Sequence, residues 1–226
     1  MIAAALDFGV VRNAAPLLAR GFGLTLEIAF FGVIGALLVG VVGAALRISP
    51  ARPARAAATA FTEFFRNTPP LVQIYFIFFA LPQVPGIGPA LKLPSVVAAT
   101  LGLILHQGAI NIEILRAGLQ AVPEGQREAA EALGLSRFDQ LRWVLVPQAV
   151  RISLPALGNN VISLFKNTVL VSSIGVLDFF GEAQDQIAIL LRSAELFIVV
   201  GVVYVICVAL LGTVFRALEQ RFAVAR

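Results

Sequence analysis

Charged residues are scarce in this chain. Asp, Glu, Lys and Arg make up 13% of its 226 residues, and 59% are hydrophobic. Soluble domains carry about 25% charged residues, so this composition indicates a membrane protein. The formal net charge of +4 does not indicate nucleic acid as a partner, because the basic residues are spread over loops between apolar runs.

The sequence lacks the residues that an intrachain disulfide, a histidine metal site or an ATP-binding loop would need. The single cysteine, Cys207, excludes an intrachain disulfide and says nothing about the compartment. The single histidine, His106, has no second histidine with which to form a metal site. No glycine-rich phosphate loop of the ATP-binding kind occurs, and no nucleophile has a believable base. We therefore expect no catalytic residues, no metal, no cofactor in this chain and no enzyme activity of its own.

Long apolar runs predict an all-α protein with five transmembrane helices, because about 20 apolar residues cross a bilayer. The first run is too long for a signal-peptide core and is not followed by a cleavage-like site, so we expect it to be retained. No repeat, low-complexity segment or linker divides the chain, which predicts one transmembrane domain over 1–226. The expected spans are 24–46, 56–81, 95–119, 152–177 and 196–215.

Some spans carry local signals of packing or of a break. Gly32, Ala36, Gly40 and Ala44 recur every four residues, which predicts a helix face that another backbone approaches closely. The pair at 69–70, Pro-Pro, should kink or break the second span. Residues 181–192 are expected to form a polar connector before the last span.

The most polar segment is the loop 123–147 between spans three and four. Pro123 suits a first helical position, and Gly134 suits a helix stop. Ser136 with Asp139 three residues later is a weak capping box. The loop is thus expected to hold two short helices.

The basic residues predict the orientation. The connectors after spans one and three and the C-terminal tail hold ten of them, and the other side holds four. Because positive charge stays in the cytoplasm, the loop 123–147 and the C-terminus should be cytoplasmic and the N-terminus outside. The ten are Arg47, Arg52, Arg55, Arg127, Arg137, Arg142, Arg151, Arg216, Arg221 and Arg226; the four are Arg12, Arg20, Lys92 and Arg192.

Charged residues inside the spans need partners or water, since a charge at a helix centre costs ~2.5–3.5 kcal/mol. Glu113 and Arg116 are three apart and should form a self-neutralised pair. Lys166 has no acidic residue within four positions, so its partner should come from another span, with Glu27 and Glu63 as candidates. Lys166 either holds helices together or attracts a substrate carboxylate. Glu27 can instead extend to water at the membrane edge.

The loop also resembles a known family. Glu128-Ala129-Ala130, then Gly134 and, after nine residues, Val144-Leu145-Val146-Pro147 resemble the cytoplasmic signature of permease subunits of binding-protein-dependent ABC importers. Segments 66–73, 111–118, 147–159 and 166–170 are similar to those of polar amino acid permeases. The chain departs from that pattern at Ile110, Ala117 and Val169, which replace the usual tyrosine, glycine and serine.

The resemblance implies a fold like that of type I ABC importers, with 123–147 as a cytoplasmic coupling loop. It implies an importer of polar amino acids in the bacterial inner membrane. The implied partners are a dimer of ATP-binding subunits, which would bind ATP and Mg, a second permease subunit (the same chain or a paralogue), and a periplasmic substrate-binding protein.

The resemblance and the polar positions together give two sets of candidate residues. Those expected to contact the ATPase are Glu124, Arg127, Glu128, Ala129, Ala130, Leu133, Gly134 and Ser136. Those expected along the substrate pathway are Glu27, Arg66, Thr68, Gln73, His106, Gln107, Asn111, Asn159, Lys166 and Thr168.

Two other functions stay open on the residues alone. A self-sufficient channel or secondary transporter could use the same spans, although such transporters often show repeated halves. A membrane anchor or sensor subunit would have no use for polar groups inside the membrane.

Overall fold

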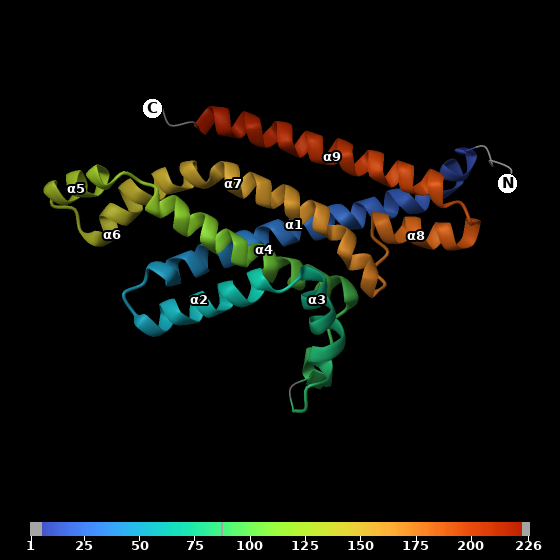
Figure 1. The fold of residues 1–226 in the computed structure, drawn as a ribbon, viewed down its shortest axis with the longest axis horizontal. Coiled ribbons are helices and arrows are strands. Elements are labelled where there is room, and N and C mark those ends of the chain that lie inside the picture. Colours follow the sequence, from blue (N-terminus) through green and yellow to red (C-terminus); the bar gives the residue numbers. More distant parts are fainter. Residues whose placement is uncertain (1–5, 87, 223–226) are drawn as a thin grey trace. The chain divides into compact units, whose positions relative to one another are not determined.

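The structure is a computed structural model that describes residues 6–86 and 88–222, and every regular element in this part of the chain is helical (Figure 1). The all-α prediction is therefore confirmed. The long helices are α1 (Gly9–Ile48), α2 (Arg52–Asn67), α4 (Ser95–Gln120), α7 (Val146–Asn167) and α9 (Ser193–Phe222).

Shorter helices connect them. α3 (Pro70–Tyr75) continues into the π-helix η1 (Phe76–Ala80) and the 3₁₀-helix η2 (Leu81–Gln83), and η3 (Gly88–Leu91) precedes α4. The loop between α4 and α7 holds α5 (Glu124–Ala132), α6 (Arg137–Asp139) and the π-helix η4 (Gln140–Leu145). After α7 follow the 3₁₀-helix η5 (Thr168–Ile174) and α8 (Phe179–Leu190).

The described chain divides into two compact units, each made of three segments. The first unit comprises 6–34, 70–103 and 163–210, and the second comprises 35–69, 104–162 and 211–222. Each unit is described by itself below.

Three described helices, α1, α4 and α9, are long and apolar enough to cross a membrane. A fourth candidate is the segment Arg137–Ile174 together with α8, bent by 45°. The expected boundary 95–119 agrees with α4, and 196–215 lies within α9. The expected span 24–46 lies within α1, which begins earlier, at Gly9. Its first turns are rich in Ala and Leu, which favour a helix even where the segment is not continuously apolar.

The expected second span is broken where the sequence predicted. α2 ends at Asn67, Thr68 has extended backbone (φ −104°, ψ 134°), and α3 starts at Pro70. The residue before a proline is driven out of the helical region by the proline ring. The region 56–81 is thus divided into α2 and the run of short helices α3, η1 and η2.

The expected polar connector at 181–192 is wrong, since most of it forms the helix α8. The Asp178 carboxylate caps this helix by accepting from Gly181 N at 3.0 Å. Thr25 Oγ1 of α1 lies 3.3 Å from Asp178 Oδ2 and accepts from Phe179 N at 2.9 Å. A carboxylate at a helix start accepts from free N–H groups and lies at the positive end of the helix dipole. This stabilisation does not depend on an apolar run, so hydropathy does not indicate it.

The first unit has two apolar clusters. One joins α1, α3 and α4 to η5 through Ile28, Ile74, Leu103 and Val171, all at most 2% exposed. The other packs α1 against α8 and α9 and includes Leu18, Phe179 and Leu196. Gly32, in this unit, faces the side chain of Leu164.

The second unit contains the rest of the small-residue face of α1. Ala36, Gly40 and Ala44 are buried, as the prediction of a packing face requires. A Cβ built on Gly40 would lie 2.5 Å from Cβ of Asn111 on α4. The two backbones can be this close only because Gly40 has no side chain.

We expect Gly40→Ala to destabilise the protein by about 1–3 kcal/mol, because the added methyl overpacks the contact with Asn111. Gly23→Ala on the same helix is the matched control, since a Cβ there meets nothing within 4 Å. Thermal unfolding of both variants in detergent checks the prediction. Equal midpoints for the two would mean that the α1–α4 contact is not tight at Gly40.

Candidate functional site

The first short helix of the loop 123–147, α5, ends in a geometry that needs glycine. Gly134 has φ +75°, its N–H donates to Glu131 O at 2.8 Å, and Leu135 N donates to Ala130 O at 3.2 Å. These two bonds form a Schellman motif, in which the left-handed residue is usually glycine. The predicted helix stop is confirmed, while Pro123 precedes the first helical residue instead of occupying it.

The second short helix begins at the predicted serine. Ser136 Oγ accepts from Asp139 N at 3.2 Å and is hydrogen-bonded to the Asp139 carboxylate. Gln140 Nε2 donates to Leu135 O at 2.9 Å, which ties the turn between the two helices to η4. The turn is thus fixed by hydrogen bonds on both sides of Gly134.

The base of the loop packs onto α4 and α7. Val122, Leu145 and Ala149 are buried together, with Leu119, Leu141 and Val144 around them. Gln148 Nε2 of α7 also donates to Gln126 Oε1 of α5 at 3.2 Å. A movement of the loop would therefore be transmitted to both helices.

The outer surface of the loop is open. Of the eight residues expected to contact the ATPase, Arg127 is half-buried and Ala130 is buried, at 2% exposed. The Leu133 side chain is 79% exposed, and Phe138 beyond Ser136 is 66% exposed. The remaining six are exposed: Glu124, Glu128, Ala129, Leu133, Gly134 and Ser136.

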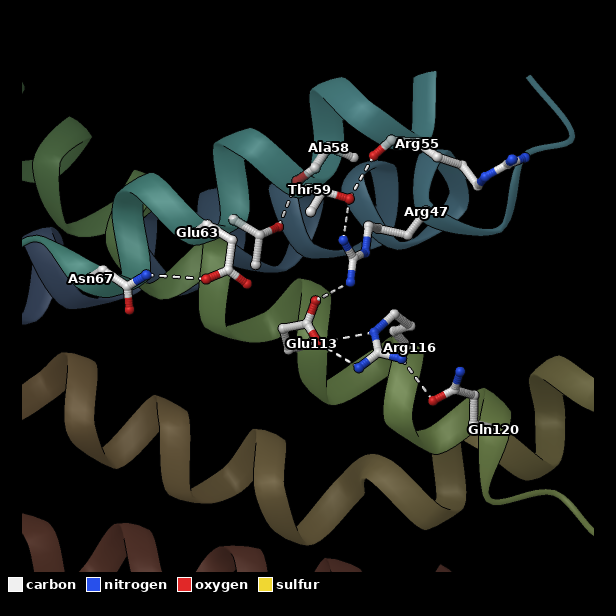
Figure 2. Close-up of polar contacts among 10 residues, drawn as sticks. Arg47, Arg55, Ala58, Thr59, Glu63, Asn67, Glu113, Arg116 and Gln120 are labelled. Atoms are coloured by element: carbon white, nitrogen blue, oxygen red, sulfur yellow. Dashed lines mark hydrogen bonds and ion pairs between the residues drawn. The ribbon is translucent and has the colours of Figure 1, made fainter. Parts of the chain in front are cut away.

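A charge cluster in the second unit centres on Glu113 of α4 (Figure 2). Arg116 donates to Glu113 Oε2 through Nε at 2.9 Å and Nη2 at 2.7 Å. Arg47 of α1 reaches the other oxygen, with its Nη2 3.0 Å from Oε1. The predicted pair of Glu113 and Arg116 is confirmed, but the prediction that it is self-neutralised is wrong, because Glu113 serves two arginines.

The same cluster joins three helices. Arg47 Nη1 donates to Thr59 Oγ1 of α2, and Thr59 in turn donates to Arg55 O at 2.8 Å (Figure 2). Arg116 also donates to Gln120 Oε1 at 2.7 Å. α1, α2 and α4 of this unit are thus connected through one carboxylate.

A cavity of about 430 Å³ lies beside this cluster. Arg66 and Glu113 bring opposite charges to its wall, and Ile110 and Ala117 line it as well. Two of the three departures from the polar amino acid permease pattern therefore face one cavity. Its other lining residues are Ile114, Gly118, Ala121, Ile152, Ser153 and Ala156.

Two of the expected pathway residues meet in a buried amide cluster in the same unit. Asn160 Nδ2 of α7 donates to Asn111 Oδ1 at 2.8 Å and to Gln107 O at 3.1 Å. The Gln107 carboxamide is fully buried and has no hydrogen-bond partner among the described residues. Nearby on α4, His106 Nδ1 donates to Phe65 O of α2 at 3.0 Å.

The other expected pathway residues are not gathered by the described contacts. In the second unit, Asn159 is exposed and Thr68 donates to Phe64 O at 2.7 Å. In the first unit, Gln73 and Thr168 are buried, and Thr168 donates to Phe165 O at 2.8 Å. Glu27 lines a separate cavity of about 360 Å³ with Arg20 and Glu182.

The surroundings of Lys166 differ from the prediction that it has an acidic partner on another span. Its side chain is exposed, and no described acidic side chain of its own unit, Glu27 included, forms an ion pair with it. The sequence placed it inside a span and required a buried partner. In the structure Lys166 lies in the last turn of α7, where a lysine side chain can extend away from the helix.

Sequence reasoning missed Arg47 and Asn160. Its place after an apolar run predicts a loop position for Arg47, but Arg47 belongs to the last turn of α1. Asn160 was noticed only as a polar residue of its span. It lies seven residues after Ser153, which is also buried and donates to Ile114 O of α4 at 3.3 Å. That spacing places both on one helix face, a signal that could have identified Asn160.

Comparisons with known proteins agree with this architecture. Residues 38–224 match the family described as binding-protein-dependent transport system inner membrane component. The chain is 36% identical over 218 residues to the glutamine transport system permease protein GlnP of Escherichia coli (strain K12), covering 96% of this chain and 98% of the relative. It is 33% identical to the arginine transport system permease protein ArtQ of Bacillus subtilis (strain 168), covering 96% and 97%.

Solved structures show the same fold. A crystal structure of an amino acid ABC transporter with histidines superposes with a TM-score of 0.89 at 32% identity, covering 96% of this chain and 99% of that one. A methionine ABC transporter in inward-facing conformations gives a TM-score of 0.73 at 23% identity, which supports the fold alone.

This chain belongs to the family of binding-protein-dependent transport system inner membrane components. It is accordingly a multi-pass inner-membrane protein and a transport component rather than an enzyme, as the sequence predicted. Its loop 123–147 is called the coupling loop from here on.

Proposed function

We propose that this chain is the permease subunit of an ABC importer that takes up polar amino acids across the bacterial inner membrane. It would act with a second permease subunit, either another copy or a paralogue, and with two ATP-binding subunits. A periplasmic binding protein would deliver the substrate. The relatives named for glutamine and arginine transport support an amino acid with a polar side chain.

The observation that carries this proposal is that the coupling loop has a fixed conformation. α5 and α6 meet at a glycine turn that hydrogen bonds hold on both sides, and the outer surface is exposed. The base is packed onto α4 and α7. A loop that only connected two helices would need neither the fixed turn nor the packed base.

The mechanism follows from this rigidity. An ATPase that closes on ATP would push or pull the coupling loop as one body, because its turn cannot open without breaking the bonds at Gly134. The loop would move the ends of α4 and α7, since their side chains pack beneath it. The pathway would then switch between inward-facing and outward-facing states. ATP and Mg would be bound by the partner subunits.

The proposed topology has five spans with the coupling loop and the C-terminus in the cytoplasm. α2 and α3 would together supply the span that the Pro69–Pro70 break divides. The N-terminus would be periplasmic. The excess of arginines on the side of the coupling loop supports this orientation.

The proposed pathway includes the cavity beside Glu113 and the amide cluster. An amino acid carries an ammonium and a carboxylate, and the cavity wall presents Glu113 and Arg66. The amides of Gln107, Asn111 and Asn160 offer both donors and acceptors without net charge. The other pathway residues, retained as proposals, are Glu27, Thr68, Gln73, His106, Asn159, Lys166 and Thr168.

The decisive experiment is purification of this chain from its native membrane in mild detergent, with co-purifying proteins identified by mass spectrometry. We expect a stoichiometric ATPase, and the number of permease chains would distinguish a homodimer from a heterodimer. Reconstituted vesicles holding the complex should then take up labelled amino acid only with ATP and the binding protein. Uptake by this chain alone without ATP would instead support the channel or secondary-transporter function.

We expect Lys166→Ala to lower uptake about tenfold while membrane insertion stays normal, because a charge-assisted hydrogen bond to a carboxylate contributes ~1.5–3 kcal/mol. The chain offers a matched control in Lys92, its only other lysine. Initial uptake rates in reconstituted vesicles check this. If the two alanine variants transport equally well, Lys166 does not belong to the pathway.

A further inference from the structure

A second cavity of the second unit lies between the coupling loop and the segment that joins α1 to α2. It has a volume of about 900 Å³, within the range of ligand sites. Arg55, Arg127 and Arg137 line it, and none of its described lining residues is acidic. The cavity is therefore strongly positive.

These three charges are poorly neutralised. Arg55 Nη1 donates to two backbone carbonyls, Ser49 O at 2.7 Å and Pro50 O at 2.9 Å, which hold the side chain without cancelling its charge. Arg127 forms only a long ion pair with the exposed Glu124, with its Nε 3.9 Å from Oε2, and its Nη2 donates to Leu119 O at 3.5 Å. Arg137 is exposed, and no described acidic residue forms an ion pair with it.

An apolar groove of about 160 Å³ lies next to this cavity, lined by residues of α1, α4, α7 and η4. The two spaces share Ala45, Ile48, Leu119 and Leu141 in their walls. The groove contains no charged lining residue, and its edges are open, with Val41 58% and Val150 46% exposed. A positive cavity thus adjoins an apolar groove on these helices.

We propose that this composite site binds one phospholipid with an anionic headgroup. The headgroup phosphate lies among the three arginines, and an acyl chain lies in the groove. Basic pockets beside transmembrane helices bind acidic headgroups in this way. A free phosphate would leave the groove empty, and a zwitterionic headgroup such as that of phosphatidylcholine would bring a quaternary ammonium next to the three arginines together with its phosphate. The lipid would brace the coupling loop against α1 and α2.

The test is native mass spectrometry of the purified full-length chain in detergent, titrated with phosphatidylglycerol and, separately, with phosphatidylcholine. We expect a retained phosphatidylglycerol and little retained phosphatidylcholine. Arg137→Gln should weaken phosphatidylglycerol binding about fivefold, because each basic residue near the headgroup contributes about that factor. Ala45→Phe, placed where the two spaces meet, should weaken it further by filling the groove.

Arg142→Gln is the matched control, since it removes one arginine from the same loop outside the cavity and should leave binding unchanged. Excess inorganic phosphate should not displace the lipid, because the acyl chain holds it. Equal retention of the two lipids, or equal binding by Arg137→Gln and Arg142→Gln, would overturn the proposal. So would unchanged lipid binding by Arg137→Gln accompanied by loss of the co-purifying ATPase, because the cavity would then hold an acidic side chain of that partner. The lipid-binding readouts need neither transport nor the ATPase, so they are independent of the proposed function.

Discussion

Gly134→Pro is expected to abolish ATP-driven uptake while the protein still inserts into the membrane. Proline fixes φ near −65°, whereas Gly134 has φ +75°. Proline also lacks the N–H that donates to Glu131 O at 2.8 Å. The turn between α5 and α6 would be lost, and the loop could no longer transmit force. The measurements are uptake in vesicles with all partners present and the amount of protein in the membrane fraction.

Two controls separate coupling from general damage. Gly134→Asn should keep most of the uptake, because asparagine tolerates the left-handed region better than other residues with side chains. Gly125→Ala on α5 should also transport normally, since a Cβ there meets nothing within 4 Å. Full transport by Gly134→Pro would refute the coupling role of this loop.

Glu113→Ala is expected to destabilise the protein by about 1.5–3 kcal/mol, because a hydrogen bond to a charged group contributes about that much and the cluster is partly buried, with the Glu113 side chain 18% exposed. Here two arginines lose their carboxylate, Arg47 at 3.0 Å and Arg116 at 2.7 Å. The contact that joins α1, α2 and α4 is lost with it. Thermal unfolding of the purified chain in detergent measures the effect.

The matched control is Glu63→Ala, since Glu63 is exposed and accepts only one described hydrogen bond, from Asn67 Nδ2 at 3.1 Å. It should change stability by less than about 1 kcal/mol. Adding Arg47→Met to Glu113→Ala should recover part of the loss, because one unpaired charge is then removed. Similar unfolding midpoints for Glu63→Ala and Glu113→Ala would show that the cluster does not stabilise the unit.

The features predicted correctly from the sequence depend on neighbours along the chain. Gly134 stops α5 because its own backbone needs the left-handed conformation. The Ser136 cap and the Glu113–Arg116 pair each join residues three apart, a separation that one helical turn brings together. The break before Pro70 follows from the proline ring itself.

The errors concern partners that are remote in sequence. The local sequence predicts a connector where the structure has α8. The start of α8 is stabilised by Asp178 together with Thr25, and Thr25 belongs to α1, far away in the sequence. Hydropathy predicts how far along a transmembrane span Lys166 lies. It does not predict in which direction the Lys166 side chain points, and in the structure that side chain is exposed. The second arginine on Glu113 was missed because Arg47 comes from another helix.

The sequence by itself determined that this is a helical membrane protein with a polar coupling loop, because hydropathy, turn residues and caps act within a few positions. It also determined the packing face of α1, since its small residues repeat with the helical period. Only the tertiary structure decided which polar residues meet: Glu113 with Arg47, Asn160 with Asn111, and the three arginines around one cavity. Those encounters depend on how separate helices pack, and several different packings are compatible with the same local pattern.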